Sequence, residues 1–223
     1  MKTLLTRARL VDPSQGLDCI GDILIEDGKI AALKDFDPPP DCRVIDCGGL
    51  VAAPGFVDMH VHLRDPGQTH KEDLFSACRA AAAGGVTSLL AMPNTRPAMD
   101  SPELVRDLLA RAQGADARVY TSACVTKGMG GRVCTDYAAL REAGAIAISD
   151  DGRPVVSSAR LLEGLRAADE LKMTFAAHCE DLELAEGALM NQGETARRLG
   201  VRGTPPAAED CGVAREIAAA ASI

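Results

Sequence analysis

The sequence predicts an α/β protein: about five βα units of a parallel (β/α)8 barrel, preceded by a small β module. Short apolar runs alternate with helical patterns five times after Pro54, and this alternation favours a parallel sheet. A doubly wound sheet fits the same alternation, but no glycine-rich GxGxxG loop follows the first apolar run. Polar residues end several of the runs, and barrels carry their chemistry at the C-terminal ends of their strands. We therefore favour the barrel.

The small β module is expected to span residues 1–53. Ile23–Ile25 and Ile30–Leu33 flank the pair Asp27-Gly28, which is a strong hairpin signal. Three consecutive prolines at 38–40 then form a stiff connector, since proline fits neither regular element. The pattern changes at Pro54, so we place the barrel portion at residues 54–223.

The barrel portion is expected to contain five parallel strands. They are Phe56–His62, Val86–Met92, Val119–Val125, Ala145–Ser149 and Met173–His178. A whole barrel has eight strands and about 250 residues, whereas Pro54 to Ile223 comprises 170. The chain is therefore expected to be incomplete and to end within the helix before a sixth strand.

Capping signals mark the helices between these strands. Thr69 and Glu72 have the spacing of a capping box for the first helix. The pair Ser101-Pro102 supplies an N-cap and a proline at the first helical position of the second. Ser157 or Ser158 is expected to cap the helix before the fifth strand.

Composition excludes several classes of function. The chain has 24 basic and 32 acidic residues, a net charge of −8, two Tyr, four Phe and no Trp, so nucleic acid is not an expected partner. No apolar run approaches the roughly 18 residues of a membrane span, and the N-terminus lacks a secretory pattern. Eight scattered cysteines without a CxxC pair favour reduced thiols over a zinc ribbon. We expect a cytoplasmic protein with a small polar ligand.

The most specific motif is a His-x-His pair at the end of the first barrel strand. His60 and His62 are two residues apart, and alternate residues of a strand point to the same side. Two imidazoles that face one point are well placed to share a divalent metal ion. The motif is followed at once by Arg64 and by the turn sequence Asp65-Pro66-Gly67, which places it where a barrel carries its chemistry.

Two later strands also end in residues that bind metals. Asp150 and Asp151 follow the fourth strand, and His178 ends the fifth. Each alone has an ordinary structural interpretation, a turn or a hydrogen-bonded histidine. Three of the chain's four histidines nevertheless lie at strand ends, while His70 is expected to face solvent. The sequence therefore predicts a metal centre built from several strand ends.

These motifs together resemble class I bacterial dihydroorotases of the amidohydrolase superfamily. The resemblance rests on the HxHxR run at 60–64, the segment AMPNTRP at 91–97, SDDG at 149–152 and AHCED at 177–181. The motifs occur in the expected order and cover nearly the whole chain. The resemblance implies a TIM-type metal-dependent hydrolase barrel and one or two zinc ions.

The resemblance also implies roles for single residues. His60 and His62 would bind the more buried metal and His178 the second. Asp151 would stand where many relatives carry a bridging carboxylated lysine. Asp150 remains the alternative to Asp151, because only the resemblance, and not the spacing, separates them.

Substrate contacts are implied for His62, Arg64 and Asn94, the latter two as partners of the substrate carboxylate. The planar guanidinium of Arg64 can make two charge-assisted bonds to one carboxylate. Asn94 has the alternative of a purely structural turn residue. The reaction would be the reversible cyclisation of N-carbamoyl-L-aspartate to L-dihydroorotate in pyrimidine biosynthesis. The general acid–base aspartate and a sixth-strand histidine ligand would lie beyond Ile223.

Two alternatives stay open at this point. The first is another cyclic amidase, an allantoinase or dihydropyrimidinase, although no lysine occurs in residues 145–151. The second is a non-catalytic dihydroorotase-like subunit that associates with aspartate transcarbamoylase. A homodimer is a further expectation for the partners of the chain.

Overall fold

The computed structural model describes residues 2–223 and divides the chain into two compact units, one up to Gly55 and one from Phe56 to Ile223. Each unit has its own sheet and its own buried cluster. Within the described residues, no helix has the length and apolar character needed to cross a membrane.

The first unit is a five-stranded mixed sheet. Strands β1 (Lys2–Asp12), β2 (Leu17–Glu26) and β3 (Lys29–Lys34) are antiparallel neighbours, and β4 (Arg43–Asp46) and β5 (Val51–Ala52) pair with β1 in parallel. A 3-10 turn, η1 (Pro13–Gln15), joins β1 to β2. The expected hairpin turn is present: Asp27 and Gly28 both have positive φ, as a type I′ turn requires.

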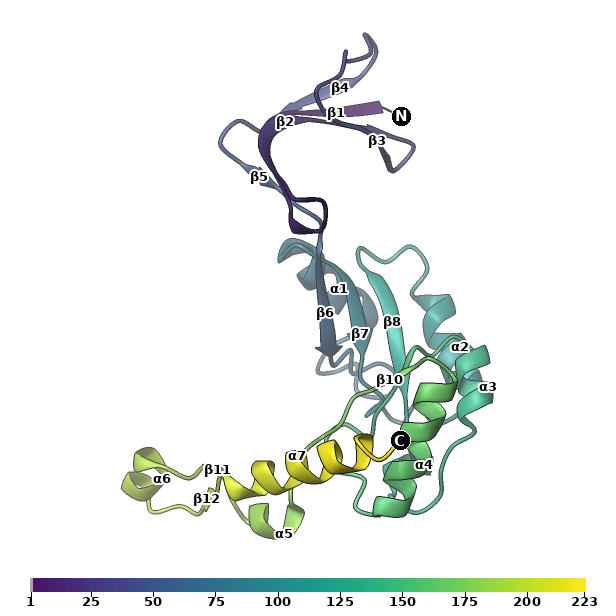
Figure 1. Cartoon of the computed structure of the whole chain (residues 1–223), viewed down its shortest axis with the longest axis vertical. Coiled ribbons are helices and arrows are strands. Elements are labelled where there is room, and N and C mark those ends of the chain that lie inside the picture. Colours follow the sequence, from purple (N-terminus) through teal and green to yellow (C-terminus); the bar gives the residue numbers. More distant parts are fainter. Residues whose placement is uncertain (1) are drawn as a thin grey trace. The chain divides into compact units, whose positions relative to one another are not determined.

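The second unit is built on a five-stranded parallel sheet, a partial barrel, with the order β10-β9-β8-β7-β6 (Figure 1). Its strands are β6 (Phe56–Val61), β7 (Val86–Ala91), β8 (Arg118–Ala123), β9 (Ala147–Ile148) and β10 (Thr174–Phe175). All five strands predicted from the sequence are found, and their parallel pairing confirms the predicted fold class. The last two strands are shorter than expected.

Helices connect these strands and cover one face of the sheet. They are α1 (Leu74–Ala83), α2 (Pro102–Arg111), α3 (Tyr137–Glu142) and α4 (Ser158–Glu170), with a 3-10 turn η2 (Lys127–Met129). Alternate strand residues separate the two faces of the sheet. Leu89 joins the large cluster beneath the helices, and its neighbour Leu90 packs with Met92 and Ala147 on the other face.

The N-cap of α1 differs from the sequence prediction. The helix begins after Asp73, whose carboxylate accepts hydrogen bonds from the backbone N–H groups of Phe75 and Ser76, both at 2.9 Å. The Ser76 hydroxyl accepts from the Asp73 N–H and completes the capping box. The predicted Thr69–Glu72 box is wrong, because the chain still turns at Gln68–Lys71. Ser157 caps α4, as predicted.

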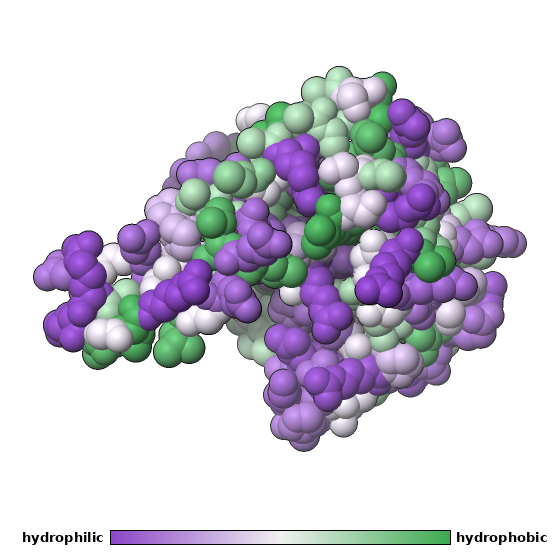
Figure 2. Space-filling view, turned by 90° about the horizontal axis from the view of Figure 1, so that it is seen from below, coloured by the Kyte–Doolittle hydropathy of each residue, from purple (hydrophilic) through white to green (hydrophobic). Residues whose placement is uncertain are grey.

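Residues after β10 form a segment that the sequence patterns did not resolve. It contains α5 (Leu182–Ala185), β11 (Met190–Asn191), α6 (Glu194–Leu199) and β12 (Gly203–Thr204), and β11 pairs with β12 in parallel. The long helix α7 (Ala207–Ala220) then returns and packs on α4 and α5. The part around α6 projects from the rest of the second unit (Figure 1), and hydrophilic residues cover much of the face seen in Figure 2.

Candidate metal centre

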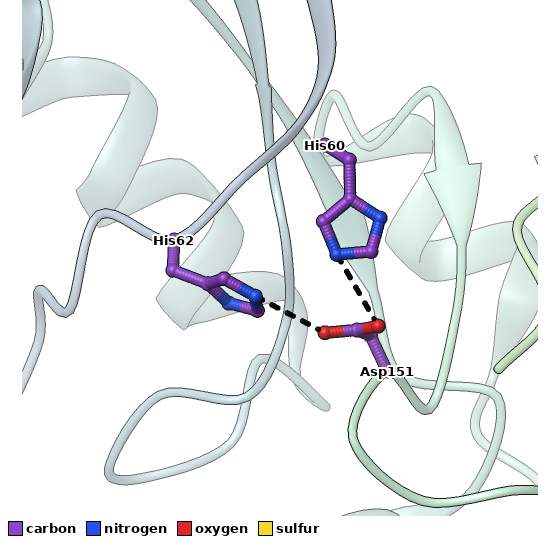
Figure 3. A group of neighbouring side chains, drawn as sticks. All are labelled: His60, His62 and Asp151. Carbon is purple, nitrogen blue, oxygen red and sulfur yellow. Dashed lines mark ion pairs between the residues drawn. The ribbon is translucent and has the colours of Figure 1, made fainter. Parts of the chain in front are cut away.

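The predicted metal ligands meet at the C-terminal ends of the parallel strands. His60 lies near the end of β6 and His62 just beyond it, while Asp151 follows β9 and His178 follows β10. Because parallel strands end at one edge of a sheet, residues far apart in sequence become neighbours there. Figure 3 shows the imidazoles of His60 and His62 directed toward the carboxylate of Asp151.

Three imidazole nitrogens surround the Asp151 carboxylate. His60 Nε2 is 3.3 Å from Oδ1, His62 Nε2 is 3.4 Å from Oδ2 and His178 Nδ1 is 3.6 Å from Oδ1. Ligand atoms of His60, His62 and Asp151 all lie within 4.8 Å of one another. The Asp151 side chain is only 8% exposed, and a buried carboxylate requires compensation of its charge. A cation held between these side chains would supply it.

Asp150 and Asp151 are neighbours in the chain but face different surroundings. The Asp150 carboxylate accepts hydrogen bonds from Val125 N (2.8 Å), Thr126 N (3.1 Å) and the Thr126 hydroxyl (2.5 Å). Burial raises the pKa of Asp150, and these three hydrogen bonds act in the opposite direction. Asp150 therefore ties the loop after β8 to the loop after β9, and the geometry favours Asp151 as the metal ligand.

Asn94 lies beside the same group, on the loop after β7. Its Oδ1 is 2.9 Å from His62 Nδ1, and its Nδ2 is 3.5 Å from Asp151 Oδ2. The side chain of Gln68 donates to the Asn94 carbonyl at 3.4 Å. Asn94 thus contacts two of the predicted ligands, which its sequence position between two prolines did not indicate.

The loop after β6 is held by one close backbone approach and one ion pair. Gly67 has φ +85°, and a Cβ at this position would lie 1.9 Å from the carbonyl oxygen of Arg96. The backbone N–H of Arg96 in turn donates to the Pro66 carbonyl at 3.1 Å. Arg111 of α2 donates to both carboxylate oxygens of Asp65 at 2.9 Å. Partial burial lowers the pKa of Arg111, but the hydrogen bonds that its guanidinium donates to Asp107 and Asp65 raise the pKa by more, so the net shift is upward. This loop positions His62 and Arg64.

Arg64 stands apart from the group. It is half-buried with φ +58°, and among the described residues no hydrogen bond or ion pair reaches its guanidinium. Two cavities adjoin Asp151, one of about 740 Å³ and one of about 410 Å³, and Arg64 lines neither. The larger is lined by His60, His178 and the start of α7, and the smaller by Asn94 and Arg153. The structure therefore leaves Arg64 outside the group formed by the other predicted residues.

Glu180 is a residue of this region that sequence reasoning missed. Its Oε2 is 3.2 Å from His178 Nε2, on the side of the ring opposite Asp151. A carboxylate two residues after a ligand-type histidine was the available signal. This signal was not informative in the sequence, because residues 177–181 contain two acidic residues and the spacing does not show which carboxylate contacts the His178 ring.

With this geometry in view, the likeness to known proteins is clear. The model of the Dihydro-orotase-like family matches residues 49–222. The chain belongs to the dihydroorotase-like family. Curated dihydroorotases align over nearly all of it: that of Syntrophus aciditrophicus is 44% identical over 220 residues and that of Aquifex aeolicus 41% identical over 217, each covering 97% of this chain. This dihydroorotase-like chain spans about half the length of those relatives, 52% and 51%.

Solved structures agree on the fold. The L-hydantoinase (dihydropyrimidinase) from Arthrobacter aurescens superposes with a TM-score of 0.79 at 20% identity, covering 99% of this chain and 50% of that one. The dihydropyrimidinase from Brevibacillus agri gives a TM-score of 0.76 at 23% identity. The dihydroorotase-like chain therefore shares its fold with about half of each of these two proteins.

Proposed function

We propose that this chain supplies the metal centre and part of the substrate site of a dihydroorotase, which interconverts N-carbamoyl-L-aspartate and L-dihydroorotate. Family membership supports the reaction class. The observation that carries the proposal is the nearly buried Asp151 carboxylate, with imidazole nitrogens of His60, His62 and His178 at 3.3, 3.4 and 3.6 Å.

The spacing of these atoms fits a zinc ion. Two atoms bound at about 2.0–2.1 Å by a tetrahedral ion lie about 3.3–3.4 Å apart, close to the His60–Asp151 and His62–Asp151 distances. Imidazole and carboxylate are ligands that zinc accepts readily. His60 and His178 lie nearest Oδ1 of Asp151 and His62 lies nearest Oδ2, and these four residues would hold one or two zinc ions. When bound, zinc lowers the pKa of a coordinated water and polarises an amide carbonyl.

The protein's own groups would orient the substrate. We assign Arg64, whose guanidinium has no partner among residues 2–223, to the substrate carboxylate, to which it can make two parallel bonds. Asn94 has Oδ1 against His62 and directs one N–H of Nδ2 toward Asp151 at 3.5 Å, so its second N–H is the group that we assign to the same substrate carboxylate. Both ring nitrogens of His62 are already engaged, so we assign His62 chiefly to the metal. The general acid–base aspartate and a further histidine ligand stay predictions.

The test is a comparison of substrates and metal content. The protein that contains this chain is purified, its zinc is measured by plasma mass spectrometry, and hydrolysis of dihydroorotate, allantoin and hydantoin is followed. We expect bound zinc and a clear preference for dihydroorotate. A preference for allantoin or hydantoin would assign the chain to another cyclic amidase. A metal-free protein without turnover, even with added zinc, would support the non-catalytic subunit instead.

The associations expected from the sequence are part of this proposal. A homodimer and a complex with aspartate transcarbamoylase are both predicted for a dihydroorotase of this kind, in the cytoplasm. Size-exclusion chromatography with light scattering, with and without the transcarbamoylase, tests both associations.

A further inference from the structure

Two imidazoles of the centre have a second partner behind the ring. His62 has Nε2 toward Asp151 and Nδ1 toward Asn94 Oδ1, at 2.9 Å. His178 is reversed: Nδ1 faces Asp151, and Nε2 lies 3.2 Å from Glu180 Oε2. Each ring thus presents one nitrogen to the centre and the other to an oxygen acceptor.

The acceptor behind a ring decides which nitrogen can bind a metal. A neutral imidazole has one N–H and one lone pair, and only the nitrogen with the lone pair is a ligand. An ionised carboxylate only accepts hydrogen bonds, so Glu180 selects the form of His178 with hydrogen on Nε2. The lone pair is then on Nδ1, the nitrogen that faces Asp151. Such outer carboxylates also fix the orientation of the ring and raise its basicity.

We propose that Glu180 is the positioning residue of His178, and that its carboxylate sets the metal affinity of this side of the centre. The inference rests on the proposed function, in that it assumes a metal at Asp151. Glu180 does not touch that metal in this proposal; it acts only through the ring of His178.

Helix α7 fixes the backbone of the segment that carries Glu180. A Cβ at Gly212 of α7 would lie 2.8 Å from the carbonyl carbon of Cys179 and 2.9 Å from the nitrogen of Glu180. The helix backbone therefore rests directly on the segment that carries the carboxylate. The N–H of Asp181 donates to the Ala208 carbonyl of the same helix at 2.8 Å. Both contacts fix the peptide groups on either side of Glu180.

The surroundings of the two side chains favour a defined contact over a loose surface pair. His178 and Glu180 are 32% and 35% exposed, and both line the cavity of about 740 Å³. No lysine or arginine of residues 2–223 forms an ion pair with Glu180. The imidazole is thus the only ion-pair partner of this carboxylate within the described residues.

The experiment uses the chain of residues 1–223 with zinc alone as the probe. Zinc affinity is measured by competition with a chromophoric chelator for the parent chain, Glu180→Ala, Glu180→Gln and the control Glu183→Ala, which changes an exposed acid of α5 three residues away. In parallel, ¹⁵N NMR of the histidines reports the tautomer of His178 in the metal-free chain at mildly alkaline pH. Circular dichroism verifies that each variant is folded.

We expect Glu180→Ala to weaken zinc binding by about 10- to 100-fold and to give His178 a mixture of tautomers. Glu180→Gln, whose amide oxygen still accepts from Nε2–H, should restore most of the affinity and the tautomer, and the control should match the parent. An unchanged His178 tautomer in Glu180→Ala would overturn the inference. A parent chain that binds no zinc would instead refute the proposed metal centre, and the tautomer result would still decide the role of Glu180.

Discussion

At the scale of single residues, two adjacent carboxylates differ in their surroundings and in the roles that we propose for them, structural for Asp150 and metal-binding for Asp151. The Asp150 carboxylate accepts three hydrogen bonds from Val125 and Thr126. Within residues 2–223, the Asp151 carboxylate faces only imidazoles and the Asn94 amide. The backbone turns between them: the Arg153 N–H donates to the Asp150 carbonyl, and Asp151 lies within this turn, so the two side chains have different surroundings. Replacing each aspartate by asparagine in turn should separate the two roles.

Asp151→Asn should lose most of the bound zinc while the fold is retained, since the amide keeps the size of the side chain but removes the negative charge. Asp150→Asn should keep its zinc but lose roughly 1–3 kcal/mol of unfolding free energy, because charge-assisted hydrogen bonds are replaced by weaker ones. Metal analysis and urea unfolding measure the two effects. Loss of zinc in Asp150→Asn, with zinc retained in Asp151→Asn, would instead make Asp150 the ligand.

Arg64→Lys should raise the KM for dihydroorotate in a dihydroorotase that contains this chain, with zinc content unchanged. Lysine keeps the charge but loses the planar fork, and a lost charged hydrogen bond is worth roughly 1.5–3 kcal/mol, or about 10- to 150-fold in KM. Steady-state kinetics measures the change, with Arg79→Lys on the exposed face of α1 as the control. An unchanged KM would give Arg64 a structural role.

At the scale of elements, the loop after β6 depends on a close contact that only glycine permits. Gly67 and Gly114 both have φ near +80°, but a Cβ at Gly67 would collide with Arg96 whereas one at Gly114 would meet open space. The pair therefore separates backbone strain from steric collision. The loop at Gly67 also packs on the one that carries Asn94, so the collision should reach the metal centre.

Gly67→Ala should cost about 2–5 kcal/mol of unfolding free energy, from the left-handed backbone and the clash together, and should weaken zinc binding. Gly114→Ala should cost only about 1–2 kcal/mol, from the backbone alone, with normal zinc affinity. Urea unfolding and chelator competition provide the two measurements. Equal losses of unfolding free energy in the two variants would mean that the loops carrying Gly67 and Arg96 can move apart at no cost in stability.

The elements also show which parts of the fold can be predicted from the sequence. Strands β6 to β10 and the Ser157 cap follow from apolar runs and capping rules, which are local. The N-cap of α1 was misplaced because Thr69, Glu72 and Asp73 all carry capping side chains, and only the path of the chain selects Asp73. β11 and β12 gave no periodic signal: they pair through a close approach of Gly203, where a Cβ would lie 2.5 Å from Gln192 Cα. The contacts of Asn94 with His62 and of Glu180 with His178 likewise depend on the tertiary structure.

At the scale of the whole molecule, the proposed metal centre would couple metal binding to the stability of the second unit. A ligand that binds only the folded state stabilises it in proportion to the logarithm of its concentration over Kd. The centre exists only when β6, β9 and β10 are aligned, so the unfolded chain offers no equivalent site. Family membership could be predicted from the four sequence motifs, whereas this coupling depends on the assembled sheet.

Zinc at about 100 times its Kd should therefore stabilise the chain by about 2.7 kcal/mol, and a chelator should reverse the gain. Calorimetric melting with and without zinc measures it. Asp151→Asn should melt at the same temperature in both conditions. A zinc-dependent shift that persists in this variant would place the stabilising ion elsewhere.

The separation of the ligands along the chain has a consequence for the order of folding. Asn94 meets His62 across 32 residues and Asp151 across 57, so each contact closes a long loop, and long loops close late. An ion that arrives during synthesis meets the local pair His60 and His62, but neither Asp151 nor His178 yet lies beside that pair. If the proposed centre binds zinc, we therefore expect full affinity only after β6, β9 and β10 have paired in register, so that zinc binding would mark a late step of assembly.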